Sequence, residues 1–349
     1  MHILYVTPYM NLGGTERCII NLIFQSLKSG CKVFLISPTG DSLERVPPGV
    51  KVYKLKNWMA SRPLTAVSEL KKALLDAGKK IDIIHVHAAA EMAYLAKKYL
   101  PEKPVIFTCH GYDNALPSYS NYWLAAKFLK KIDVCVVLNP LDKDYFIRAG
   151  IKRENLFFIP NGVDERFFSS PNTKDTCSKV VGIVGRLVRQ KNIKWAIKTQ
   201  AKFKFASKFL IVGEGPLRKK LENYVKMLEL DDQIQFLGYQ EKVENIYPLF
   251  SYLLVCSRNE AFALIVLEAL ASGTAVFIPG WLPGLVRLWG SSPGVFVFED
   301  GKDLKEKIEM RRGKDDVEKI QDFARNFSWK RIFKKYEKLY NQLLKRDDL

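Results

Sequence analysis

The chain has 349 residues, of which 48% are hydrophobic and 12% aromatic, as is typical of a globular protein large enough for two domains. Its 55 lysines and arginines and 37 acidic residues give a net charge of +18, which indicates either an anionic partner (a phosphorylated ligand, nucleic acid or an anionic membrane) or a basic surface that serves solubility. No uncharged apolar run reaches about 18 residues and the chain opens on a strand pattern, so we expect neither a membrane-spanning helix nor a signal peptide.

The first half of the chain alternates between strand and helix patterns. Strands are predicted at 2–8, 32–37, 50–55, 81–87, 104–109, 134–138 and 156–159. Helices are predicted between them, one ending at 27 and others at 64–77, 90–100, 122–131 and 141–149. This order is typical of a parallel sheet covered by helices on both faces, which binds ligands at the carboxyl ends of its strands.

Two features of the first half follow strand ends. Gly13 and Gly14 would bring backbone N–H groups and a helix N-terminus to one point, which suits a phosphate group, although such a turn is often purely structural. The pattern is neither G-x-G-x-x-G nor a Walker loop. His110 follows the strand 104–109 and is either a site residue or a capping residue.

The second half begins after a polar stretch. Residues 169–179, with Ser, Pro, Asn and Thr, are predicted to be a linker. Strands follow at 180–184, 209–212, 234–237, 253–256, 275–278 and 296–298, with helices at 193–206 and 217–228 and another that ends at Gly273. We therefore expect two doubly wound domains, 1–168 and 180–327, and a C-terminal helix within 328–349 whose apolar stripe docks on the protein's own core.

Charged residues gather at strand ends in the second half. Arg186 and Lys191 follow the strand 180–184, where two cations could neutralise a diphosphate without a metal ion, or could simply be solvated. Glu260 lies in a loop, and Glu268 lies in an almost wholly apolar helix. Because a buried carboxylate needs hydrogen-bond partners, Glu268 faces either sugar hydroxyls or a polar group of the protein.

Cysteine and histidine give no strong metal signal. The cysteines form no C-x-x-C pair and are expected to be reduced core residues of a cytoplasmic protein; they are Cys18, Cys31, Cys109, Cys135, Cys177 and Cys256. His85 and His87 share one face of a predicted strand. A zinc site there is an alternative that lacks further ligands nearby.

Taken together, these motifs resemble the GT-B fold and, more narrowly, the retaining glycosyltransferases of family 4. The resemblance covers nearly the whole chain and rests on motifs in a fixed order: LGGTE (12–16), DIIHVH (82–87), TCHG (108–111), IPNGVD (159–164), VGRLVRQKN (184–192), IVGEGP (211–216), FLG (236–238), the E-x7-E pair (260–268), EALASGTAV (268–276) and NFSWKRIFKKY (326–336). It implies two Rossmann-like domains that face each other across a cleft, the first for the acceptor and the second for a nucleotide sugar. The last helix is expected to cross back to the first domain.

The resemblance implies how the donor diphosphate is held. Backbone N–H groups of Gly13 and Gly14 approach the diphosphate. Arg186 and Lys191 hold the phosphates and stabilise charge on the leaving nucleotide, in the place of a divalent metal. We therefore expect no metal and no other cofactor.

The resemblance also implies where the sugar and the nucleoside bind. Glu260 and three backbone N–H groups contact hydroxyls of the donor sugar; these N–H groups belong to Ala261, Phe262 and Ala263. Glu268 binds the ribose. The base lies between the loop that contains Gly213 and Gly215 and the backbone near Leu237 and Gly238.

Catalysis is implied to rest on four side chains: Glu260, His110, Arg186 and Lys191. His110 would lie near the reacting sugar. Retention of configuration would proceed by front-face attack, in which the leaving phosphate oxygen takes the acceptor proton, so that no strong general base is needed.

Two features depart from the family pattern. Ala261 stands where members often have glycine, and its methyl group would narrow the sugar pocket. After Val276 the usual glycine pair and Pro-Glu are replaced by FIPGWLPG (277–284), which brings the contacts of that loop, and activity itself, into question.

The implied acceptor is a glycan or a lipid-linked acceptor in surface polysaccharide or lipopolysaccharide synthesis. The implied donor is a UDP- or GDP-sugar, and the implied enzyme is a hexosyltransferase. The predicted helix 122–131, YWLAAKFLKK, either contacts an anionic membrane at its cytoplasmic face or is a core helix with a solvated basic side. No nucleic-acid-binding motif is visible.

Two other functions remain open. One is an enzyme of the same fold that isomerises or hydrolyses a nucleotide sugar. The other is a catalytically degenerate subunit that binds a nucleotide sugar or a membrane as a partner of another protein; the altered loop after Val276 favours it, whereas Arg186, Lys191, Glu260 and Glu268 argue against it.

Overall fold

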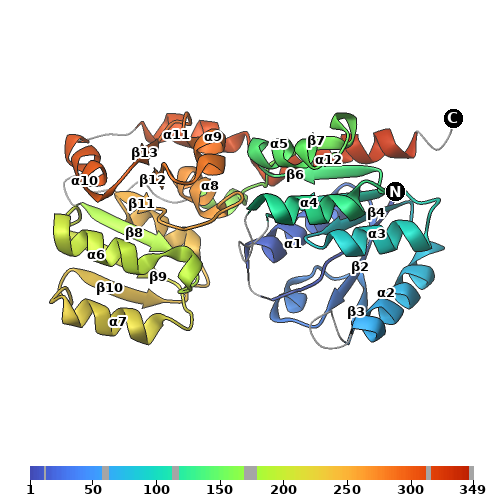
Figure 1. Ribbon diagram of the computed structural model, residues 1–349, viewed down its shortest axis with the longest axis horizontal. Coiled ribbons are helices and arrows are strands. Elements are labelled where there is room, and N and C mark those ends of the chain that lie inside the picture. Colours follow the sequence, from blue (N-terminus) through green and yellow to red (C-terminus); the bar gives the residue numbers. More distant parts are fainter. Residues whose placement is uncertain (12, 57–62, 112–117, 169–178, 312–315, 346–349) are drawn as a thin grey trace. The chain divides into compact units, whose positions relative to one another are not determined.

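The computed structural model describes residues 1–11, 13–56, 63–111, 118–168, 179–311 and 316–345. The chain divides into two compact units, Met1–Gly162 with Trp329–Leu349, and Val163–Ser328 (Figure 1). All of the predicted linker except Lys179 lies outside the described residues. The chain passes into the second unit at Val163, a few residues before the boundary predicted at 168, and the last helix belongs to the first unit.

The first unit is built on a seven-stranded parallel sheet with the order β3-β2-β1-β4-β5-β6-β7. Its strands are β1 (His2–Val6), β2 (Lys32–Pro38), β3 (Lys51–Leu55), β4 (Ile83–His87), β5 (Val105–Cys109), β6 (Val134–Val137) and β7 (Leu156–Phe158). The chain moves outward from β1 to β3 and then returns to place β4 on the other side of β1. The topological switch point of this sheet therefore lies between the adjacent strands β1 and β4.

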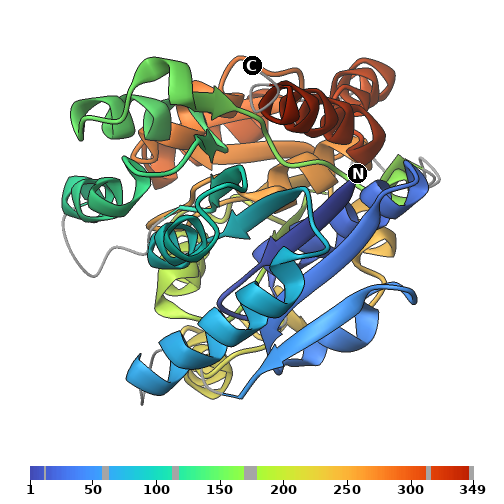
Figure 2. The same ribbon diagram turned by 90° about the vertical axis from the view of Figure 1, so that its right-hand side faces the viewer.

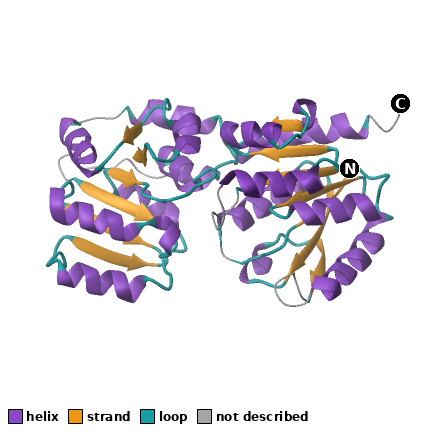
Figure 3. Cartoon of the chain, in the orientation of Figure 1, coloured by secondary structure: helices purple, strands orange, loops and turns teal. Residues whose placement is uncertain are grey.

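Helices cover both faces of this sheet (Figure 3). One face packs against α2 (Pro63–Gly78), α3 (Ala90–Tyr99), α4 (Ser118–Leu129) and α5 (Pro140–Arg148). On the other face, α1 (Gly14–Lys28) packs against α12 (Trp329–Leu344), the dark red end of the chain in Figure 2. Short 3-10 turns occur at Asp41–Arg45 and Arg153–Asn155.

The second unit contains a six-stranded parallel sheet with the order β10-β9-β8-β11-β12-β13. Its strands are β8 (Val180–Val184), β9 (Lys208–Val212), β10 (Ile234–Gly238), β11 (Tyr252–Leu254), β12 (Ala275–Pro279) and β13 (Val295–Phe298). Here the direction of winding changes between β8 and β11, so this sheet has its own switch point. The predicted doubly wound α/β architecture is confirmed for both sheets.

The helices of the second unit are α6 (Ile193–Phe203), α7 (Arg218–Met227), α8 (Leu264–Ala271), α9 (Pro283–Trp289), α10 (Gly301–Met310) and α11 (Val317–Arg325). The sequence predictions did not include α9, α10 or α11. Helix α11 buries Ile320 and Ala324 and packs on α8. This cover explains why a helix as apolar as α8 is stable at this position.

The cysteines of the described residues are placed as expected for reduced core residues. The five cysteines within the described ranges are free and buried, and Cys177 lies outside them. Across the described residues, no helix combines the length and the apolar character needed to cross a membrane. In the same part of the chain, no three His, Cys, Asp or Glu side chains are grouped to hold a metal ion.

A buried polar network ties α12 to the first sheet. His85 of β4 lies between two hydroxyl groups: its Nδ1 is 2.7 Å from the Tyr340 hydroxyl of α12, and its Nε2 is 2.7 Å from Thr108 Oγ1 of β5. The Tyr5 hydroxyl of β1 is 3.4 Å from that of Tyr340 and 2.8 Å from Ser26 Oγ of α1. Both ring nitrogens of His85 are thus engaged within the protein, which leaves them unavailable to the zinc site that the sequence left open.

The same network makes the first unit sensitive to acid. Burial, with a smaller contribution from His110, lowers the pKa of His85 to about 3. The unfolded chain takes up this proton near its ordinary pKa of about 6.5. The stabilisation is therefore complete above that pH and is lost as the pH falls toward the folded-state pKa.

We predict that the free energy of unfolding falls on the order of 3 kcal/mol between pH 7 and pH 4 from one such histidine, as measured by urea titrations at each pH. The variant His85→Gln, which keeps a polar side chain but does not titrate, should be less stable at pH 7 and show a shallower pH dependence. Equal pH dependence in the two proteins would contradict the assignment to His85.

Candidate functional site

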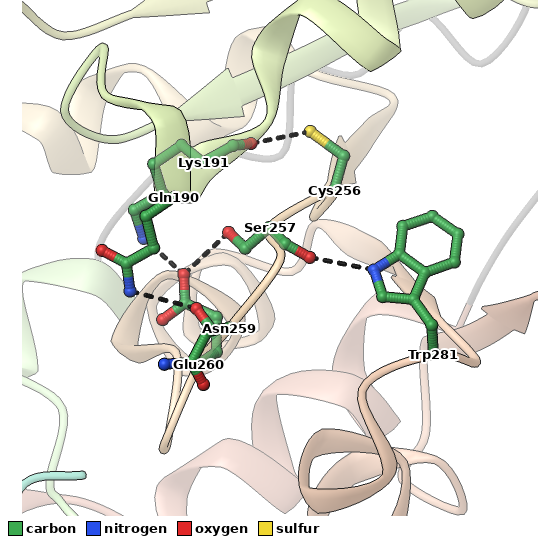
Figure 4. A network of polar contacts seen from close by, with 7 residues as sticks. All are labelled: Gln190, Lys191, Cys256, Ser257, Asn259, Glu260 and Trp281. Atoms are coloured by element: carbon green, nitrogen blue, oxygen red, sulfur yellow. Dashed lines mark hydrogen bonds and ion pairs between the residues drawn. The ribbon is translucent and has the colours of Figure 1, made fainter. Parts of the chain in front are cut away.

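Two loops meet at the switch point of the second sheet, beyond the carboxyl ends of the adjacent strands β8 and β11. One loop follows β8 and contains Arg186 and Lys191; the other follows β11 and contains Glu260. Lys191 Nζ donates a hydrogen bond to Glu260 Oε1, and the two side chains form an ion pair (Figure 4). Two of the predicted site residues are thereby brought into direct contact.

This ion pair is shielded and oriented by its surroundings. The side chains of Lys191 and Glu260 are only 19% and 11% exposed. Ser257 Oγ donates a second hydrogen bond to the same carboxylate oxygen at 2.8 Å. A charge pair that is largely removed from water and has an extra hydrogen bond holds a defined geometry, unlike a solvated surface pair.

Main-chain contacts hold the two loops together. The backbone N–H of Arg258 donates to Gln190 O at 2.8 Å, and Gln190 Nε2 donates to Asn259 O at 3.1 Å. The Cys256 thiol donates to Lys191 O at 3.2 Å, as Figure 4 shows. The relative position of the lysine and the carboxylate is therefore fixed by the backbone as well as by their charges.

Glycines let the next loop approach closely. A Cβ atom on Gly213 would lie 2.1 Å from Gly185 O, and one on Gly215 would lie 2.7 Å from Leu187 N. Leu187 N–H donates to Glu214 O at 2.8 Å, and Gly213 N–H donates to Gly238 O at 2.8 Å. The segments predicted to surround the base, Gly213 to Pro216 and the backbone near Leu237 and Gly238, are thus joined to the loop that carries the predicted phosphate-binding residues.

The two predicted phosphate-binding residues differ in their surroundings. Lys191 is paired with Glu260, whereas Arg186 is exposed. Among the ion pairs of the described residues, none includes Arg186. Its guanidinium, always charged in proteins, therefore stands at the carboxyl edge of the sheet as a cation that an anionic ligand can use.

Glu268 lies on the inner side of α8 and is 5% exposed. Its Oε2 atom accepts a hydrogen bond from the buried Tyr247 hydroxyl at 2.7 Å. The alternative in which Glu268 meets a polar group of the protein is thus realised for this oxygen. A contact of Glu268 with a ribose stays a prediction.

The three residues predicted to offer backbone N–H groups form the entry to α8. Phe262 and Ala263 are buried and Ala261 is half-buried. Ala263 adopts the left-handed conformation, with φ of 55° and ψ of 73°, and α8 begins at the next residue. The residues that link Glu260 to α8 are thus held in a largely buried, non-helical conformation.

Gly13, Gly14 and His110 lie in the first unit, at the carboxyl edge of its own sheet. Helix α1 begins at Gly14, as the glycine turn predicts. A Cβ on Gly13 would lie 2.6 Å from Glu16 Oε2, so the buried Glu16 carboxylate occupies the space beside Gly13. This negative charge at a helix N-terminus is favourable by itself and opposes a phosphate there unless cations compensate.

His110 has a partner that the sequence analysis did not assign. His87 Nδ1 and His110 Nε2 are 3.0 Å apart and share a hydrogen bond. Burial lowers the pKa of His110 to about 4, and burial together with the two neighbouring histidines lowers the pKa of His87 well below its usual value. Both rings are neutral at pH 7, so His110 can exchange hydrogen bonds with a ligand but does not supply a positive charge.

Sequence models of two known domain families cover most of the chain. Glycosyltransferase Family 4 matches residues 12–167, and Glycosyl transferases group 1 matches residues 164–310. The chain is a glycosyltransferase of the GT-B type. The predicted GT-B fold is thus confirmed, and the resemblance to family 4 holds at the level of these two domains.

Proteins of similar sequence include transferases whose names give a lipid or lipid-linked substrate. This glycosyltransferase is 28% identical to a Campylobacter jejuni α-1,4-N-acetyl-D-galactosaminyltransferase named for a diphosphoundecaprenol-linked substrate, over 77% of each chain. It is 26% identical to one component of human phosphatidylinositol N-acetylglucosaminyltransferase, over 96% of this chain and 74% of that protein. The crystal structure of Anabaena HepE with UDP and glucose superimposes with a TM-score of 0.82 and 17% identity, over 98% of this chain and 100% of the other.

Several residues of this site were missed in the sequence analysis. Ser257 stands three residues before Glu260 and carried a signal that could have been used, since a hydroxyl at that spacing can reach back to a loop carboxylate. Tyr247 and Trp281 gave no such signal, because they come from segments distant in sequence. In this glycosyltransferase the loop that departs from the family pattern places the Trp281 indole on Ser257 O, at 3.0 Å.

We predict that Gly213→Ala destabilises the second unit and abolishes nucleotide binding, because the added methyl group meets Gly185 O at 2.1 Å in a backbone with φ of +127°. Thermal unfolding and calorimetric titration with UDP and GDP measure the two effects. The matched control is Gly30→Ala, where φ is also positive at +77° but nothing lies within 4 Å. If both variants lose the same stability, strain at positive φ alone accounts for the effect and the close approach does not matter.

Proposed function

We propose that this protein is a retaining hexosyltransferase that moves a sugar from a UDP- or GDP-sugar to a glycan or lipid-linked acceptor in surface polysaccharide or lipopolysaccharide synthesis. The contact between Lys191 and Glu260 carries the proposal. In a nucleotide sugar the anomeric carbon is bonded directly to a phosphate oxygen. A site for this donor therefore needs a cation for the phosphate beside an acceptor group for sugar hydroxyls, and this pair supplies both.

The proposed role of Arg186 and Lys191 is electrostatic. As the bond to the sugar breaks, negative charge grows on the leaving phosphate, and two fixed cations stabilise it without a metal ion. Glu260 holds the Lys191 side chain in a defined orientation before the donor binds. Gly13 and Gly14 would add backbone N–H groups to the diphosphate.

The proposed sugar and nucleoside contacts follow from the loop and helix after β11. Glu260 and the N–H groups of residues 261–263 would bind sugar hydroxyls, and Glu268 would bind the ribose. Attack from the front face lets the leaving phosphate oxygen accept the acceptor proton. The neutral His110 then needs only to orient the sugar, which agrees with its lowered pKa; NMR of the product's anomeric proton tests retention.

Relatives support the choice of acceptor class. The Campylobacter relative is named for a substrate on diphosphoundecaprenol, and the human relative is named for phosphatidylinositol. Both names describe sugars added to lipid-linked substrates. For this chain we infer an acceptor of the same general kind, reached at the cytoplasmic face of a membrane.

Helix α4 has the surface that such an acceptor would require. Its inner side buries Ala125 and Leu129 in the first core, while Trp123 and Leu124 are 51% and 50% exposed. Lys127 Nζ lies 3.8 Å from the centroid of the Trp123 ring. The helix is thus a core helix on one side and an aromatic and basic surface on the other, a combination suited to peripheral contact with anionic lipid.

The binding experiment for the donor is calorimetric titration of UDP and GDP, without metal, into the wild type and Arg186→Ala. We predict that one nucleotide binds the wild type and binds the variant about 10 to 100 times more weakly, because a charge-assisted hydrogen bond to phosphate is lost. Arg189→Ala is the matched control, since it removes an equal charge from the same exposed loop.

Equal weakening in Arg186→Ala and Arg189→Ala would attribute binding to general charge and contradict the assigned site. Binding of neither nucleotide by the wild type would favour the degenerate partner protein, whose supporting observation is the altered loop after Val276. Turnover of a nucleotide sugar without any acceptor would favour the isomerase or hydrolase.

We predict that the double variant Trp123→Ser, Lys127→Glu binds vesicles containing anionic phosphatidylglycerol at least about fivefold more weakly than the wild type, since each lysine near such a surface contributes about 1 kcal/mol. Vesicle sedimentation measures the binding. Lys198→Glu, on an exposed position of α6, controls for net charge. Unchanged binding of the double variant would leave α4 as a core helix with a solvated basic side.

A further inference from the structure

Two tryptophans from one segment hold the loop that carries Glu260. Both follow β12: Trp281 lies in the segment 277–284 that departs from the family pattern, and Trp289 is the last residue of α9. Trp281 Nε1 donates to Ser257 O at 3.0 Å, and Trp289 Nε1 donates to Phe262 O at 3.0 Å. The two indoles therefore bind the main chain on either side of Glu260.

The accepting carbonyls belong to buried residues. Ser257 is 2% exposed and Phe262 is 3% exposed, and the donor Trp289 is fully buried. Beside Trp289, water cannot readily replace a lost donor, so Phe262 O would be left with an unmet hydrogen bond. Trp281 is 38% exposed, so its ring lies at the edge of the solvent while the carbonyl it binds belongs to a buried residue. The contact of Trp289 thus constrains the loop more than a solvent-exposed bond of the same length would.

The contact of Trp289 lies next to a strained residue. Phe262 O belongs to the peptide group that precedes Ala263, whose φ of 55° is unusual for a residue with a side chain. Such conformations persist where the surroundings over-determine them. Trp289 supplies part of this restraint twice, through its N–H on Phe262 O and through edge-to-face packing on the Phe262 ring at 5.2 Å.

Trp281 reaches the carboxylate through one residue. Ser257 is bonded at both ends: its carbonyl accepts from Trp281, and its hydroxyl donates to Glu260 Oε1 at 2.8 Å (Figure 4). The Trp281 ring is itself held edge-to-face by Trp195 at 5.2 Å and Phe298 at 5.4 Å. The direction of the Glu260 carboxylate is therefore linked to an aromatic cluster outside the loop.

We propose that Trp281 and Trp289 are positioning residues that set the loop 257–263 in the conformation that receives the donor sugar. This inference rests on the proposed function, because it takes Glu260 to be a ligand of the sugar. Neither indole needs to touch the donor. In this chain the segment after Val276 supports the sugar site indirectly, through hydrogen bonds to the main chain of the loop 257–263.

The two tryptophans should affect the affinity contributed by the sugar and not the affinity contributed by the nucleotide. Arg186 and the glycine loop at 213–215 are not bonded to either tryptophan, so the affinity for a nucleoside diphosphate should change little when an indole N–H is removed. The additional affinity contributed by the sugar should fall. A general loss of stability would instead weaken both ligands together.

The primary test is Trp281→Phe, which removes the N–H and keeps an aromatic ring. Calorimetry gives the dissociation constants for UDP, UDP-glucose, GDP and GDP-mannose, and the ratio of nucleotide-sugar to nucleotide affinity is compared with that of the wild type. We expect this ratio to fall about fivefold for the nucleotide that binds, as for the loss of one hydrogen bond. An unchanged ratio would overturn the proposal.

Trp195→Phe is the matched control. It removes an indole N–H from the same aromatic cluster, where no hydrogen bond from that N–H to the described main chain is found, and it should leave the ratio unchanged. An equal fall in Trp195→Phe would mean that packing of the cluster, and not the bond to Ser257, sets the loop, and would also overturn the proposal.

A second measurement does not depend on a ligand. Amide hydrogen exchange of the loop 257–263 in the ligand-free protein should be faster in Trp281→Phe and Trp289→Phe than in the wild type, and unchanged in Trp195→Phe. Trp289 is fully buried, so a change there affects folding most. If Trp289→Phe does not fold, Trp281→Phe alone tests the positioning role. If the wild type binds none of the four nucleotides, the proposed function fails, while unchanged exchange would refute the positioning role itself.

Discussion

The shielded contact between Lys191 and Glu260 is the interaction on which the second unit's site depends. An ammonium and a carboxylate removed from most of the solvent are stable only as a pair, because either charge alone would lose much of its solvation without compensation. The fold provides the pair by placing β8 beside β11, although some seventy residues of chain separate the two side chains. The backbone bonds between the loops and the close approach of the glycine loop at 213–215 then keep the pair in one geometry.

The two units use polar residues in opposite ways. In the second unit, Lys191 and Glu260 form a shielded pair at the carboxyl edge of the sheet, and Arg186 is exposed there. In the first unit, burial keeps His85, His87 and His110 neutral; both ring nitrogens of His85 meet hydroxyl groups, and His87 shares a hydrogen bond with His110. A neutral histidine cluster in the first unit and cations in the second fit the proposed reaction, in which charge develops on the leaving nucleotide.

The loop after Val276 illustrates how a departure from a family pattern can be absorbed. The glycine pair and Pro-Glu expected there are absent. From the sequence alone, this absence suggests that contacts of the site have been lost. In the structure, the replacing residues lead into α9, and Trp281 among them donates to the main chain of the loop that carries Glu260, as does Trp289 at the end of α9. The departure is therefore accompanied by new contacts to the same loop, and the loss of one set of residues does not leave the site unsupported.

The sequence by itself determined the two parallel sheets, since alternating apolar strand and helix patterns leave few other packings, and it located the strand ends where Gly13, His110, Arg186, Lys191 and Glu260 lie. It did not reveal α9 to α11, whose short amphipathic patterns are weaker than those of the sheet-forming segments. Only the tertiary structure decided that Lys191 pairs with Glu260, that Tyr247 meets Glu268, that His87 meets His110 and that Trp281 reaches Ser257. These contacts join segments far apart in the chain, and their geometry depends on strand order and loop approach, which local residue patterns do not encode.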